Sequence, residues 1–173
     1  MSLIAEPIAT ERLLLEPLRT DHAAPMAAVL ADPRLYHRIG GAPPTPAELR
    51  RRYTAMLAGP GEPGHAWLNW IIGDPEPAGT VQATVTPGDS GPSAALAWIV
   101  GTGRQGRGLA SESARAVAAW LAANGVRCIT AAIAPGHRAS EGVARSCGMA
   151  PTAERQAGER IWRSAAPACA PPR

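Results

Sequence analysis

The 173-residue sequence contains no phenylalanine, and aromatic residues make up only 4% of it. A folded core therefore has to be built from alanine, leucine, valine, isoleucine and the five tryptophans. The sequence also lacks a secretory signal pattern and any apolar run long enough to span a bilayer, so we expect no membrane contact and a cytoplasmic location. Apolar residues at 46% and charged residues at 18% are typical of a globular domain.

Lysine is absent as well, so arginine supplies all 17 basic residues, and the formal net charge is only +3. So modest a charge does not predict a nucleic-acid surface, and the preference for arginine is typical of a biased genome composition. The three cysteines lack the C-x-x-C spacing of zinc sites, and we expect no metal ion.

Helix signals are clear at several points of the chain. Thr45 and Glu48 have the spacing of a capping box, with Pro46 at the first helical position. Thr20 or Asp21 is the expected N-cap of an earlier helix. The expected helices cover residues 20–31, 46–57, 109–124 and 139–147.

Strand signals surround these helices. Three apolar runs at 66–72, 79–86 and 94–100 are separated by short turns rich in Gly, Pro and Asp, which favours an antiparallel meander. Further strands are expected at 12–19, 127–134, 150–156 and 159–164. The pattern predicts a mixed α/β (α+β) sheet, with residues 1–165 as a single domain and residues 166–173 as a flexible tail.

The most informative segment is residues 98–110, which reads W-I-V-G-T-G-R-Q-G-R-G-L-A. A short strand-like run leads into a loop with four glycines and two arginines, and a helix begins directly after it. Amides at a helix N-terminus have no intrahelical partner and lie at the positive end of the helix dipole. The segment therefore predicts a site for a phosphate or pyrophosphate group.

One frame of this loop, Gly101-x-Gly103-x-x-Gly106, matches the dinucleotide-binding fingerprint. That motif requires a parallel strand before the loop and an acidic residue about 20 positions further on. Here the preceding strand closes an antiparallel meander, and the following strand at 128–133 contains no carboxylate. We therefore do not expect a nicotinamide or flavin site.

A second frame gives a better match. Residues 105–110, Q-G-R-G-L-A, resemble the pattern Q/R-x-x-G-x-G/A, which is the pyrophosphate loop of the GNAT N-acetyltransferases. Residues 10–18 and the segment 137–149, which runs from H-R-A-S to G-M, are similar to the RimJ/RimL-like ribosomal-protein N-acetyltransferase branch of that family. The resemblance implies a mixed, mostly antiparallel central sheet flanked by about four helices.

The resemblance also implies acetyl-coenzyme A (acetyl-CoA) as co-substrate. By analogy, the amides from Gly106 to Ser111 hold the pyrophosphate, and Arg104 and Arg107 either assist by charge or are ordinary surface residues. Main-chain groups of the strand at 98–100 pair with the pantetheine arm. The expected cofactor-binding residues are Trp98, Ile99, Val100, Arg104, Gln105, Gly106, Arg107, Gly108, Leu109, Ala110, Ser111, His137 and Ser140.

The implied reaction is direct transfer of an acetyl group, in a ternary complex, to a primary amine: a protein N-terminus, a polyamine, an amino acid or a drug. The enzyme is expected to be a monomer or homodimer. Many relatives carry a tyrosine that protonates the leaving thiolate, but that position is Ala144 here. Ser140 is the candidate replacement, and the alternative is that it only caps a helix. The missing tyrosine also leaves open a non-catalytic CoA-binding module of the same fold.

The remaining roles are less constrained. The strand at 130–132 lacks the glutamate that some relatives use as a base, which leaves His65, Glu112 or a water molecule. Glu112 has the alternative role of complementing the helix dipole. The acceptor is expected where the loop at 32–46 meets the strand at 67–70, and the candidate lining residues are Tyr36, His37, Trp67 and Asn69.

Overall fold

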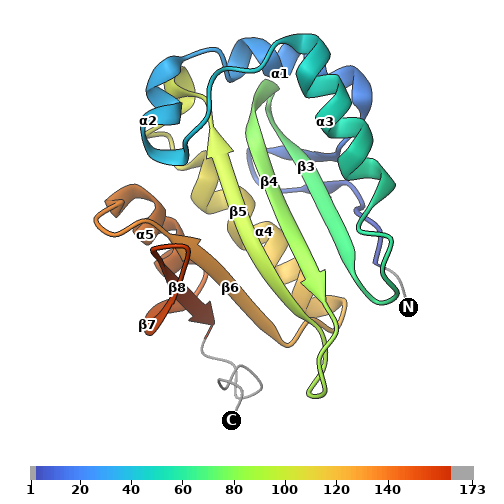
Figure 1. Ribbon diagram of the computed structural model, residues 1–173, viewed down its shortest axis with the longest axis vertical. Helices are drawn as coiled ribbons and strands as arrows, with labels where there is room; N and C mark the ends of the chain where they lie inside the picture. Colours follow the sequence, from blue (N-terminus) through green and yellow to red (C-terminus); the bar gives the residue numbers. More distant parts are fainter. Residues whose placement is uncertain (1–2, 165–173) are drawn as a thin grey trace.

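The computed structural model describes residues 3–164, so the predicted tail lies outside the described residues. These residues form an eight-stranded sheet in the order β1-β2-β3-β4-β5-β6-β8-β7 (Figure 1). Every pair of neighbouring strands is antiparallel except β5 and β6. The strands are β1 (Ile8–Ala9), β2 (Leu14–Pro17), β3 (Ala66–Asp74), β4 (Glu76–Thr86), β5 (Ser93–Val100), β6 (Cys128–Ile133), β7 (Met149–Gln156) and β8 (Glu159–Ser164). The α-helices are α1 (Ala23–Val29), α2 (Tyr36–Ile39), α3 (Pro46–Ala58), α4 (Leu109–Ala123) and α5 (Arg138–Ser146), with short 3₁₀ helices η1 (Thr20–His22), η2 (Pro33–Leu35) and η3 (Thr102–Arg104).

The predicted meander and the predicted helices α3, α4 and α5 are confirmed. Helix α3 begins with the expected capping box, in which the Glu48 amide donates to Thr45 Oγ1 at 3.2 Å and the Thr45 amide donates to Glu48 Oε2 at 2.8 Å. The turn between β3 and β4 is shorter than predicted, because both strands extend to a tight connection at Pro75.

The first helix differs from the prediction at its start. Residues Thr20–His22 form a 3₁₀ turn, and His22 is the N-cap of α1, so neither Thr20 nor Asp21 caps the α-helix. The segment after Asp32, expected to be a loop, contains η2 and α2. Its first turn is stabilised by Asp32, whose Oδ1 accepts a hydrogen bond from the Arg34 amide at 2.9 Å.

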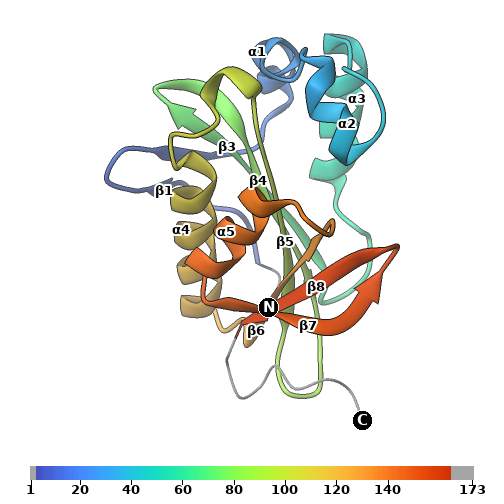
Figure 2. The same cartoon turned by 90° about the vertical axis from the view of Figure 1, so that its left-hand side faces the viewer.

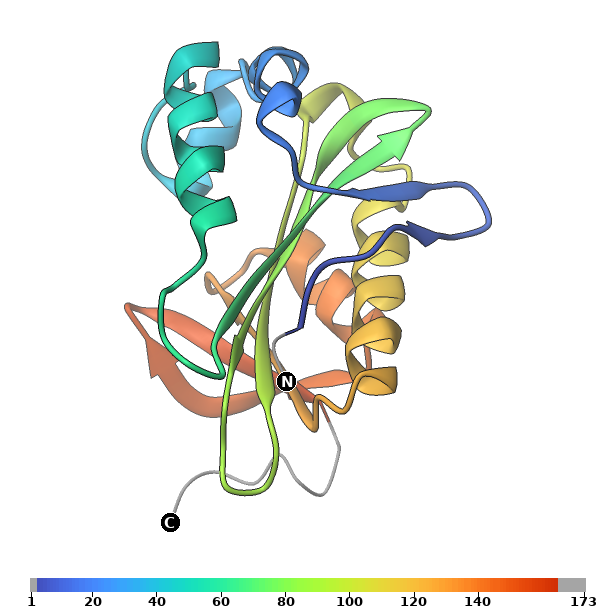
Figure 3. The same cartoon turned by 90° about the vertical axis from the view of Figure 1, so that its right-hand side faces the viewer.

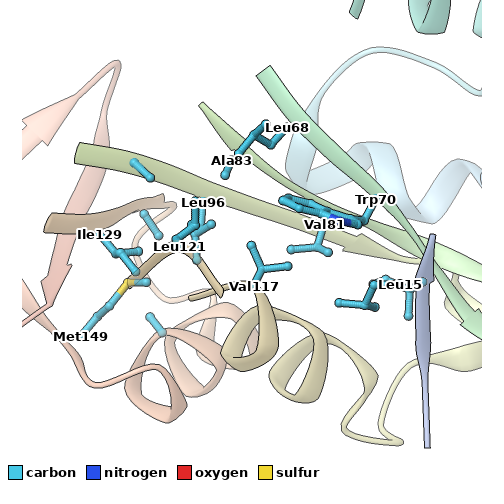
Figure 4. Packing of buried hydrophobic residues seen from close by; sticks show 14 of the residues in the cluster. Leu15, Leu68, Trp70, Val81, Ala83, Leu96, Val117, Leu121, Ile129 and Met149 are labelled. Carbon is cyan, nitrogen blue, oxygen red and sulfur yellow. The ribbon is translucent and has the colours of Figure 1, made fainter. Parts of the chain in front are cut away.

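Helices cover both faces of the sheet (Figures 2 and 3). Helices α4 and α5 lie on one face, and α1, α2 and α3 lie near one end of the other. Without phenylalanine, the larger core is centred on Trp70, which is fully buried and makes an edge-to-face contact with Trp120. Val117 and Leu121 of α4 pack beneath the sheet residues of this core (Figure 4). None of the helices in residues 3–164 is both long and apolar enough to cross a bilayer.

Strands β5 and β6 separate partway along their length. Their parallel pairing covers only Ser93–Ala95 against Cys128–Thr130, although β5 continues to Val100 and β6 continues to Ile133. Beyond the paired part, β6 is held instead by β8 on its other edge. The two strands therefore diverge towards the end of the sheet where α5 begins (Figure 1).

Candidate functional site

A cavity of about 630 Å³ lies at the diverging ends of β5 and β6. It is bounded by the end of β5, the glycine loop, the first turn of α4 and the first turn of α5. Every cofactor-binding residue expected from the sequence lines it except Arg107. The further lining residues are Arg34, Leu35, Thr102, Ala139 and Val143.

The glycine loop presents backbone to this cavity. Gly106 and Gly108 have φ angles of 76° and 78°, a left-handed conformation that residues with a side chain adopt at a cost. The first hydrogen bond of α4 runs from the Glu112 amide to the Gly108 carbonyl at 3.0 Å. The amides of residues 109–111 therefore precede the intrahelical ladder, at the positive end of the helix dipole. This arrangement is suited to an anion.

Both arginines of the loop form ion pairs with Asp74, at the end of β3. Arg107 Nη2 lies 3.0 Å and Arg104 Nη1 lies 3.5 Å from Asp74 Oδ2, and Arg104 also donates to the Asp74 carbonyl at 2.9 Å. Arg104 nevertheless lines the cavity, whereas Arg107 does not. Of the two guanidinium groups of the loop, therefore, only that of Arg104 belongs to a residue that lines the cavity.

The end of β5 forms the opposite wall of the cavity. Trp98, Ile99 and Val100 pair with β4 along one edge, and no β6 residue pairs with their other edge. The Val100 carbonyl accepts a hydrogen bond from Gln105 Nε2 at 2.9 Å, which ties the loop to the strand. An extended polar ligand could add to this strand edge as another strand would.

Helix α5 contributes His137 and Ser140 to the cavity. The N-cap of α5 is His137, and Ser140 lies within the first turn, so the alternative in which Ser140 only caps the helix is wrong. Ala144, at the position of the expected tyrosine, is fully buried. Cys147 packs against the core, and burial raises the pKa of its thiol, which does not suit a nucleophile.

Comparison with known proteins now decides the family. Residues 12–150 match the family model described as "Acetyltransferase (GNAT) domain". The chain belongs to the GNAT acetyltransferase family. No curated protein matches the sequence significantly.

Solved structures confirm the GNAT fold. One is RimL, the ribosomal L7/L12 α-N-protein acetyltransferase in complex with coenzyme A, at 19% identity and a TM-score of 0.76, covering 91% of this chain and 97% of that one. Another is an acetyltransferase from Agrobacterium tumefaciens, at 25% identity and a TM-score of 0.68, covering 94% and 96%. A third is AAC(6')-Ib in complex with paromomycin and acetyl-CoA, at 18% identity and a TM-score of 0.72, covering 89% and 93%. The GNAT resemblance and the fold class expected from the sequence are both confirmed, and RimL is among the solved structures with this fold.

One part of this GNAT site was not predicted from the sequence. Arg34 of η2 lines the cavity, and its Nη2 lies 2.6 Å from Asp32 Oδ2. The same Asp32 oxygen accepts a hydrogen bond from Thr102 Oγ1 at 2.6 Å. The hydrogen bonds from Arg34, with that from Thr102, hold the pKa of Asp32 well below its usual range. The pattern Asp32-Pro33-Arg34 is a helix-start signal that could have located this segment.

The candidate bases do not line this cavity. Glu112 is engaged by Thr10 and Arg12. His65 lies instead in a second cavity together with Trp67 and Asn69, beside the loop that follows α3. Tyr36 does not line that second cavity, because its hydroxyl donates to the Leu30 carbonyl at 2.9 Å within the core under α1 and α3. His37 does not line it either, so only Trp67 and Asn69 of the four expected acceptor residues line this second cavity.

Proposed function

We propose that this GNAT protein transfers an acetyl group from acetyl-CoA to a primary amine. The observation that carries the proposal is the cavity beside the part of β5 that has separated from β6, because the glycine loop and the N-terminus of α4 form one end of this cavity and the edge of β5 forms its wall. An anionic, extended, amide-containing molecule fits both features at once.

The residues fit coenzyme A at each expected part. The amides that follow Gly106 and Gly108 are placed to hold the pyrophosphate, and Arg104 supplies positive charge beside them. The edge of β5 at Trp98–Val100 is placed to pair with the pantetheine amides. His137 and Ser140 approach the same region from α5.

When bound, acetyl-CoA supplies an activated acetyl thioester. The tasks left to this chain are to orient an amine, to stabilise negative charge on the carbonyl oxygen and to place a proton on the leaving sulfur. Backbone near Val100 is the candidate donor for the oxyanion. Ser140 is the candidate proton donor to sulfur, since this residue lines the cavity from α5.

The acceptor is a primary amine such as a protein N-terminus, a polyamine, an amino acid or a drug. The named activities of RimL on a ribosomal protein and the complex of AAC(6')-Ib with paromomycin support this range. We propose that the protein acts as a monomer or homodimer. Neither His65 nor Glu112 lines the cavity, so an ordered water, the third of the expected alternatives, is the proposed proton acceptor.

Two measurements test the proposal. Thermal unfolding with ~1 mM coenzyme A should show stabilisation of about 2.7 kcal/mol for a Kd near ~10 μM, with no stabilisation by NAD or NADP. Thiol release from acetyl-CoA over a panel of amines then tests catalysis. Stabilisation by NAD and not by coenzyme A would overturn the proposal.

A second candidate is a non-catalytic CoA-binding module, and Ala144 is the observation that favours it. A buried alanine replaces the tyrosine that relatives use as the acid, so the usual proton source is missing. A protein that binds coenzyme A but releases no thiol with any amine of a broad panel would support the binding module over the enzyme.

A further inference from the structure

Arg12 contacts the glycine loop but does not line the cavity. It belongs to the turn that joins β1 to β2, about a hundred positions before the residues it contacts. Its Nη1 donates to the Arg107 carbonyl at 3.2 Å, and its Nε donates to Glu112 Oε2 at 2.7 Å. One side chain thus bridges the loop and the first turn of α4.

The partner carboxylate is held firmly. Glu112 is only 11% exposed, and it accepts hydrogen bonds from Thr10 Oγ1 at 2.6 Å and from the Arg12 amide at 3.1 Å. Thr10 Oγ1 also accepts a hydrogen bond from the Leu13 amide at 2.9 Å, which closes the turn. The Arg12 guanidinium therefore binds a carboxylate that is itself held in place, unlike the guanidinium of an isolated surface arginine.

This contact fixes the direction of one peptide group. In a trans peptide the carbonyl and the following N–H point in opposite directions. Because the Arg107 carbonyl points at Arg12, the Gly108 N–H points away from Arg12. Gly108 lines the cavity, whereas Arg12 and Arg107 do not, which makes this N–H a candidate donor to a ligand in the cavity.

We propose that Arg12 is a positioning residue that holds the Gly108 amide towards the phosphate groups of coenzyme A. The inference rests on the proposed function. It requires an arginine, because a guanidinium fork can donate to the carboxylate and to the carbonyl together, whereas a lysine ammonium can retain the ion pair with Glu112 but cannot span both groups in this geometry.

The test compares two acetyl donors, acetyl-CoA and the phosphate-free thioester S-acetyl-N-acetylcysteamine. For Arg12→Lys we expect an unfolding midpoint close to that of the wild type, a Kd for coenzyme A raised about tenfold, and an unchanged KM for the short thioester. If the role of Arg12 were purely structural, Arg12→Lys would weaken the binding of both donors equally, or of neither.

The matched control is Arg163→Lys, which makes the same exchange at a two-bond pair of an arginine with a carboxylate, that of Glu154, and neither residue lines the cavity. We expect it to leave the Kd for coenzyme A unchanged. If the wild type binds coenzyme A and Arg12→Lys binds it equally tightly, this inference is wrong and the proposed function is unaffected. A wild type that does not bind coenzyme A overturns the proposed function, and this inference with it.

Discussion

Replacing Gly79 with alanine should displace the end of β5, the strand that forms one wall of the cavity. Gly79 lies in β4 directly opposite Val100 of β5. A Cβ atom at this position would lie 2.1 Å from the Ile99 carbonyl oxygen and 2.9 Å from Val100 Cα. Both neighbours are backbone atoms, so no side-chain rotation can relieve the contact.

The size of the effect follows from these distances. Reaching the short end of the ordinary contact range, 3.4 Å, requires the two strands to separate locally by about 1.3 Å. The adjacent hydrogen bond from the Gly101 amide to the Ala78 carbonyl, now 2.9 Å, would then be stretched beyond a useful length. Overpacking of this kind costs about 1–3 kcal/mol, while alanine regains about 0.4–1 kcal/mol by restricting the unfolded chain. The net expectation is a destabilisation centred near ~1.3 kcal/mol and reaching at most about 2.6 kcal/mol.

The assay is equilibrium unfolding in urea, followed by tryptophan fluorescence, together with the Kd for coenzyme A. Gly103→Ala is the matched control, because a Cβ at Gly103 meets nothing within 4 Å and the residue has no positive φ. The control should be neutral or slightly stabilising and should keep its affinity for coenzyme A. A Gly79→Ala variant as stable as the wild type would refute the argument from close strand approach.

Three further predictions concern the loop and its neighbours. Gly108→Val should abolish the stabilisation by coenzyme A in thermal unfolding, because a β-branched residue does not tolerate a φ of 78°. Ser140→Ala should lower kcat by about 100-fold with an unchanged Kd for coenzyme A, and an unchanged kcat would remove Ser140 from the role of acid. The hydrogen bond from Thr10, and then the contacts with Arg12, hold the pKa of Glu112 below its ordinary value of 4.5. The ionised Glu112 therefore adds stability that is fully present above pH 4.5 and is lost as the pH falls through its folded pKa, so the unfolding free energies of wild type and Glu112→Gln should converge in acid.

The features predicted correctly from the sequence are those encoded within a few neighbouring residues. The capping box of Thr45 and Glu48 specifies a helix start by itself, and the glycines at 106 and 108 specify a loop with positive φ. The predicted cavity residues came from this loop, the strand before it and the segment 137–149, once the GNAT resemblance was recognised. Only Arg107 was placed differently, because its partner Asp74 lies at the end of a strand more than 30 residues earlier.

The features that were missed depend on distant contacts. Nothing near Glu112 predicts that Thr10 and Arg12 hold it, so the choice between a base and a dipole partner could not be made from sequence. The helical turns after Asp32 were missed because Asp32 and Pro33 follow directly on the helix expected at 20–31. The pair was therefore interpreted as the end of that helix and not as the start of another. The pairing of β6 with β8 was likewise not specified by the residues of either strand.

The position of β8 has a consequence for the order in which the cavity forms. Strand β8 is the last of the described strands to be synthesised, yet it lies between β6 and β7 (Figure 1). It pairs with four residues of β6, whereas β5 pairs with only three. During translation, β6 therefore lacks its larger partner until the chain has been made as far as residue 164. A nascent chain that stops before β8 should have the glycine loop, but the end of β6 that leads to α5 and its cavity residues would lack a partner strand.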